Sequence, residues 1–132
     1  MLTALALIGQ GLTAQPSWQA HKVVSLEYPA LAAQARIEGV IEVDCAISDD
    51  GSVRTAQPRG GNEILAKAAR ENVLKWRFYR TGTDAVAGNQ TALVVYTFKL
   101  TVTCSKNHCP TTFTFEFPNL ALVETEVPGW QP

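Results

Sequence analysis

The sequence has few of the residues that build catalytic, metal or nucleic-acid sites. It contains three cysteines and two histidines in 132 residues, and eleven basic residues face twelve acidic ones for a net charge of −1. No run of Lys and Arg occurs, which argues against DNA or RNA as a partner. Beyond the first residues no apolar stretch resembles a membrane span. Nearly half of the residues are apolar, so we expect one domain with a real core.

The first residues, MLTALALIGQGLTAQ, are the one candidate targeting segment. Leu2 to Ala14 are apolar or small, which is the length of a signal-peptide core and too short to cross a bilayer. No Lys or Arg precedes this run, and a cleavage point after Ala14 would have Leu12 three positions back. The alternative is a buried N-terminal segment. We expect residues 1–14 to be a signal segment, residues 15–25 to be a polar lead, and the protein to be exported to the periplasm.

Two stretches have helical features. Pro29 suits the first turn of a helix in YPALAAQARIEG, which should end by Gly39. Asn62 is placed to cap a second helix. Its apolar stripe at helical spacing consists of Ile64, Leu65, Ala68, Ala69 and Leu74. At the end of this helix, Trp76 is expected to be a core residue.

Four stretches carry strand signals. Ile41, Val43, Cys45 and Ile47 alternate with polar or small residues, and Asp50-Gly51 marks a tight turn into a second strand around Val53. The run TALVVYTFKLTVTC places one apolar face on Val94, Tyr96, Phe98, Leu100 and Val102. TTFTFEF alternates in the same way through Phe113, Phe115 and Phe117. Periodicity does not decide whether the tail, residues 119–132, adds a strand.

These elements, in this order, resemble the TonB C-terminal domain. The resemblance covers residues 26 to 103 and rests on Tyr28-Pro29, Ala33, Gly39-Val40, Val43, Asp50-Gly51, Ala68-Ala69 and Trp76-Arg77-Phe78. It implies an α+β fold with two helices on one face of a small antiparallel sheet. The first strand of the domain would lie between the second and the third.

The resemblance also implies a function. Members of the family grip outer-membrane transporters by pairing the free edge of the third strand with a short transporter segment. This chain shows no inner-membrane anchor and no Pro-rich spacer, and it has Tyr79-Arg80 where the family often has a proline. A domain without an anchor could not transmit force from an inner-membrane motor, so the sequence leaves a part in energy transduction undecided. We expect a non-catalytic binding module.

The stretch CSKNHC, residues 104–109, separates two of the strand-like runs. A hairpin with Cys104 opposite Cys109 would pair Leu100 with Phe113, Phe98 with Phe115 and Tyr96 with Phe117, which matches the two apolar faces. In an oxidising periplasm this predicts a Cys104–Cys109 disulfide that fixes the register. A zinc site with His108 lacks a fourth ligand, and a redox pair normally has two residues between its cysteines. Cys45 is expected to be a buried free thiol, with a bond to Cys104 or Cys109 as the alternative.

The same hairpin would occupy the edge of the third strand that the family uses for binding. The domain would then comprise residues 26–118, with 111–117 as an added C-terminal strand and 119–132 as a tail. A partner should instead meet the outer edge of the added strand, at Thr112, Thr114 and Glu116.

Side chains with catalytic potential are sparse. Glu42 and Asp44 share one strand face, and a solvated face answered by Lys99 is a better interpretation than a paired-carboxylate site. We expect no catalytic residue, no metal and no cofactor. The predicted function is a periplasmic protein-binding module, an accessory to TonB-dependent outer-membrane transport with a protein partner in the cell envelope. The alternative is a small periplasmic enzyme or inhibitor that reuses the fold.

Overall fold

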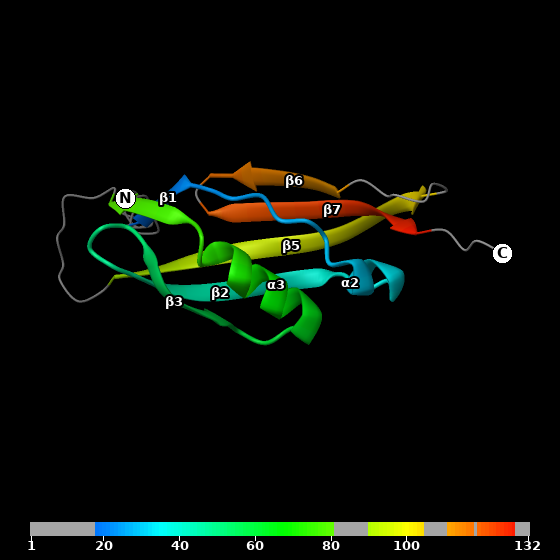
Figure 1. Cartoon of the computed structure of the whole chain (residues 1–132), viewed down its shortest axis with the longest axis horizontal. Helices are drawn as coiled ribbons and strands as arrows, with labels where there is room; N and C mark the ends of the chain where they lie inside the picture. Colours follow the sequence, from blue (N-terminus) through cyan, green and yellow to red (C-terminus); the bar gives the residue numbers. More distant parts are fainter. Residues whose placement is uncertain (1–17, 81–89, 105–110, 118, 129–132) are drawn as a thin grey trace, which may run out of the picture.

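The computed structural model describes residues 18–80, 90–104, 111–117 and 119–128, with the side chains of 102–104 and 127–128 excepted (Figure 1). Its elements in chain order are β1 (Trp18–Lys22), α2 (Ala30–Gln34), β2 (Gly39–Ile47), β3 (Val53–Pro58), α3 (Glu63–Val73), β4 (Arg77–Arg80), β5 (Thr91–Cys104), β6 (Thr111–Glu116) and β7 (Leu120–Pro128). The expected signal segment, residues 1–14, lies outside the described residues. Neither helix in the described ranges is long and apolar enough to cross a membrane.

Five strands form one long sheet in the order β3-β2-β5-β7-β6. The first strand of the predicted domain, β2, lies between the second and the third, as expected, and both pairings are antiparallel. The sheet is mixed rather than purely antiparallel because β7 runs parallel to β5. The α+β fold with two helices is confirmed, and the tail that periodicity left undecided supplies a strand inside the sheet.

The predicted hairpin between residues 91–104 and 111–117 is wrong. β6 pairs with β7, so that Phe113 lies opposite Val123 and Phe115 opposite Ala121. Only three residues separate Glu116 from Leu120, and so short a connection favours an antiparallel neighbour. Alternation correctly placed Phe113 and Phe115 on the core side. It did not identify their neighbour, because β7 offers the same apolar alternation as β5.

Both helices lie in front of the five-stranded sheet (Figure 1). α3 packs across β3 and β2, and α2 packs near β7. The side chain of Asn62 caps α3 as predicted, accepting hydrogen bonds from the amides of Ile64 and Leu65 at 2.8 and 3.2 Å. Leu74 is the exception in the predicted apolar stripe, since it is 36% exposed. The buried positions of the last turn belong to Asn72 and Val73.

The expected polar lead is partly a strand. β1 pairs with β4 to form a second, two-stranded sheet at one end of the molecule. Asn119, which is buried, joins it to the large sheet: its Oδ1 accepts from the amide of Ala20 and its Nδ2 donates to the carbonyl of Trp18. The small sheet thus covers the core beside β5 and β7.

One core runs between the helices, the small sheet and the inner face of the large sheet. Trp76 is 1% exposed, which confirms its predicted place, and its ring lies 5.9 Å from Tyr96 and 5.8 Å from Phe115. A buried amide lies beside these rings. Asn72 Oδ1 accepts from Trp76 Nε1 at 2.9 Å and from the Tyr96 hydroxyl at 2.7 Å, while its Nδ2 donates to the carbonyls of Val24 and Ser25.

Candidate functional site

The edge of β5 that the resemblance assigns to partner binding is closed by β7. The pairing starts with Val95 opposite Leu120 and continues to the end of both strands, where Cys104 lies opposite Pro128. The backbone of Val95 also donates to the carbonyl of Asn119 at 3.1 Å. An arriving peptide would have to displace β7 along this length. The edge is occupied as predicted, but by residues 120–128 rather than 111–117.

The outermost strand on this side is β6, which carries the predicted partner edge. Thr112, Thr114 and Glu116 are all exposed, and they alternate with the partly buried Phe113 and Phe115. An open strand edge presents free backbone donors and acceptors to a second strand. The geometry therefore suits pairing with an extended segment at β6.

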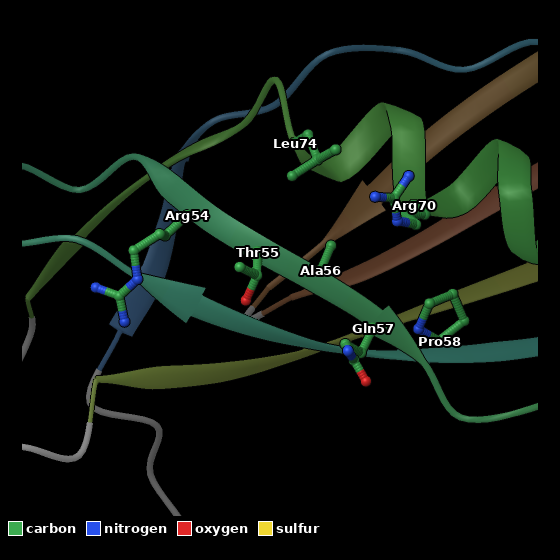
Figure 2. A pocket seen from close by; sticks show the side chains of 7 residues that line it. All are labelled: Arg54, Thr55, Ala56, Gln57, Pro58, Arg70 and Leu74. Atoms are coloured by element: carbon green, nitrogen blue, oxygen red, sulfur yellow. The ribbon is translucent and has the colours of Figure 1, made fainter.

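The other outer strand, β3, borders a groove against α3 (Figure 2). The groove has a volume of about 380 Å³. Five of its lining residues come from β3, one from α3 and one from the C-cap of α3: Arg54, Thr55, Ala56, Gln57, Pro58, Arg70 and Leu74. It contains two cationic side chains and no acidic one, and sequence reasoning did not identify it.

The carboxylates of Glu42 and Asp44 pair with Arg59. The sequence had suggested Lys99 as their partner, which is wrong. Arg59 Nε lies 2.6 Å from Asp44 Oδ2, Nη2 lies 2.8 Å from Oδ1, and Nη1 lies 3.3 Å from Glu42 Oε1. The bond to Asp44 raises the pKa of the guanidinium. Arg59 reaches them because it follows β3, whose residues lie beside β2. These are exposed ion pairs on the helix-free face, and they form no acid-base pair.

The buried thiol and the two buried phenols stay protonated at neutral pH. Burial, with Asp44 next to it, raises the pKa of the Cys45 thiol to about 12, and burial raises that of Tyr28 to about 12 as well. The pKa of Tyr96 is also raised by burial. Within the described ranges, no three His, Cys, Asp or Glu side chains lie close enough to hold a metal ion. His21 is exposed and stacks edge-on against Tyr79.

Cys45 and Cys104 lie in different parts of the large sheet. Cys45 is buried and free, as expected. It lies opposite Ala92, near the start of β5, whereas Cys104 lies at the far end of that strand. Twelve residues of strand span about 40 Å, and a disulfide requires Cα atoms within about 7 Å, so a Cys45–Cys104 bond is excluded. The predicted Cys104–Cys109 bond lies outside the described side chains and stays a prediction.

Two buried asparagines that sequence reasoning missed hold these surfaces in place. Asn72 joins α3 to β5 and to the segment after β1, and Asn119 joins β1 to the β6–β7 hairpin. The burial of Asn72 could have been predicted from its helical position, because it lies three residues after Ala69 on the buried face of α3. No comparable signal marks Asn119.

Comparison with known proteins identifies a family. Residues 24–100 match the model of a family described as Gram-negative bacterial TonB protein C-terminal. The matched region runs from the segment before α2 to the middle of β5, which is more than half of the chain. No curated protein and no solved structure matches the chain. Strands β6 and β7 lie outside the matched region.

Proposed function

The chain belongs to the TonB C-terminal domain family, and from this premise we propose that it is a non-catalytic protein-binding module of the periplasm. It would serve as an accessory to TonB-dependent outer-membrane transport and would bind a protein of the cell envelope. The proposal includes export through the N-terminal segment. Mass spectrometry of the protein from the periplasm should then find a chain that starts near Gln15. An intact Met1 in a cytoplasmic fraction would contradict export.

The observation that carries the proposal is the occupied edge of β5. Because β7 already pairs with the strand that other members present to transporters, this chain would offer β6 instead. Strand addition gains affinity from main-chain hydrogen bonds and specificity from alternate side chains. Here the alternate side chains facing away from the core would be Thr112, Thr114 and Glu116.

The test is capture of partners from envelope extract with matched variants. Thr114→Lys places a long charged side chain on the edge strand, which is a natural device against strand pairing. Thr91→Lys makes the same change on the same sheet face but on β5, away from β6, where Thr91 lies opposite Ala46 of β2 and before the pairing with β7 begins. A partner retained by Thr91→Lys and lost by Thr114→Lys supports the proposal. If both variants retain the partner equally, the β6 edge is not the binding site.

The alternative, a small enzyme or inhibitor, finds less support. An enzyme needs a nucleophile or an acid-base pair within reach of a pocket. The groove beside β3 has two arginines, but its lining contains no carboxylate, histidine or cysteine. An inhibitor would still bind a protein, and the capture experiment would recover its target.

A further inference from the structure

The groove between β3 and α3 is a local concentration of positive charge on a chain whose net charge is −1. Arg54 and Arg70, both exposed, line it. Within the described ranges neither makes an ion pair, whereas Arg59 bonds to Asp44 and Lys67 to Glu71. The groove therefore offers two guanidinium groups that no carboxylate of the described chain neutralises.

Between these charges the lining is part polar and part apolar, and its apolar part includes Ala56 and Leu74. Ala56 is 5% exposed and points toward the helix, and Leu74, the residue after the end of α3, lies above it and is 36% exposed (Figure 2). Arg54 lies near the start of β3 and Arg70 on the helix above the strand. The two charges are thus spread along the groove, which suits an extended chain better than a single small anion.

The backbone of β3 adds a third feature. The backbone N–H of Arg59 donates a hydrogen bond to the carbonyl of Glu42, so the backbone polar groups of Arg59 point toward β2. Antiparallel ladders alternate between residues that bond inward and residues that bond outward. Ala56 and Pro58 therefore face outward. Ala56 offers an amide and a carbonyl to a neighbouring strand, while Pro58 offers a carbonyl only and limits the length of the pairing.

We propose that this groove binds an extended acidic segment of a protein partner. The carboxylates of the segment would pair with Arg54 and Arg70, an apolar side chain would lie between Ala56 and Leu74, and the main chain would bond to Ala56. Charge-assisted hydrogen bonds from arginine to carboxylate favour this chemistry. The groove and the β6 edge lie on opposite sides of the sheet, so binding in the groove does not depend on whether a partner binds at β6.

The first test is fluorescence anisotropy with a labelled peptide that alternates Glu and Val, compared with one that alternates Lys and Val. The Glu peptide should bind and the Lys peptide should not. Arg54→Glu and Arg70→Glu should each weaken binding about tenfold or more, because a charge-assisted bond becomes a repulsion. Lys99→Glu makes the same change in net charge on the helix-free face and should leave the affinity within about twofold, since distant exposed charges are screened.

An equal loss in Lys99→Glu would mean that net charge alone governs binding, and it would overturn the groove. Arg70→Gln, which removes the charge without adding an acid near the end of α3, should weaken binding in the same direction. Thermal melting checks that each variant is folded.

The second test locates the peptide by NMR. In the ¹⁵N-labelled protein the amides of Ala56, Gln57, Arg70 and Leu74 should shift on titration with the Glu peptide. Shifts confined to residues 111–116 would place the peptide on β6, which would reject the groove and leave the proposed function intact. Absence of any shift at millimolar peptide would reject the groove as well.

Discussion

The two faces of the five-stranded sheet are built from alternate residues of the same strands, yet one face is buried and the other is exposed. On the covered face, Tyr96 and Phe98 lie under the helices, and no buried polar side-chain atom of the described residues lacks a hydrogen-bond partner. On the bare face, Val40, Leu93 and Leu120 are 57%, 39% and 39% exposed. Among the described residues, the buried contacts that stabilise the fold are therefore concentrated on one face, and the other face carries exposed side chains.

The largest effect should come from Asn72 on the covered face. Asn72→Ala removes four hydrogen bonds and leaves Trp76 Nε1 and the Tyr96 hydroxyl without their acceptor. Buried donors without partners are costly, so we expect a loss of about 3 kcal/mol in the free energy of unfolding. Urea denaturation measures it. Tyr96→Phe, which removes only one of the four bonds, should cost about 1 kcal/mol. If Asn72→Ala loses less stability than Tyr96→Phe, the hydrogen-bond network of Asn72 does not stabilise the covered face.

The second effect separates two glycines with the same backbone conformation. Gly51 and Gly60 both have φ of 90°, but a Cβ at Gly51 would lie 2.1 Å from the carbonyl oxygen of Phe78, while a Cβ at Gly60 meets nothing within 4 Å. Gly51 lies where the β2–β3 turn contacts β4, and its own carbonyl accepts from the Phe78 amide at 2.8 Å.

Gly60→Ala should cost about 1 kcal/mol through backbone strain alone. Gly51→Ala should cost about 1 kcal/mol more, because β4 must also shift. Comparison of the two denaturation midpoints checks this. Equal costs would show that the small sheet is not tightly fitted against the turn.

The third effect is a pH dependence from Cys45. Its pKa is about 12 in the folded chain against an ordinary value of 9.0. The unfolded thiol ionises first, so the stabilising contribution is complete below pH 9 and is lost as the pH rises toward 12. Between these values the free energy of unfolding should fall by about 1.4 kcal/mol per pH unit for this one proton.

Denaturation of wild type and Cys45→Ala between pH 9 and 10 isolates the contribution of the thiol as a difference in slope, because Tyr28 and Tyr96, whose pKa values burial also raises, are present in both proteins. Cys45→Ala should show the shallower slope. Identical slopes would mean that the thiol is accessible to water.

Sequence alternation predicted which residues are buried better than it predicted what they touch. Val43, Cys45, Tyr96 and Phe98 are all buried as expected, because strand parity alone fixes the face. The neighbour of β6 was not predictable, since its apolar residues fit β5 and β7 equally well. The groove could not be predicted for another reason. Arg54 and Arg70 belong to different elements, and only the packing of α3 on β3 brings them to one site.

The smallest effect should come from Arg59 on the bare face. Arg59→Ala removes three bonds to Glu42 and Asp44, nearly as many as Asn72→Ala removes. The carboxylates left behind are exposed, however, and water solvates them at once, whereas the donors left by Asn72 are buried. Exposed ion pairs contribute little and are weakened by salt. We expect the denaturation midpoint to move less than in any variant above, and the difference to vanish in high salt. A loss as large as that of Asn72→Ala, unchanged by salt, would show that the bare face also stabilises the fold, and the contrast between the two faces would fail.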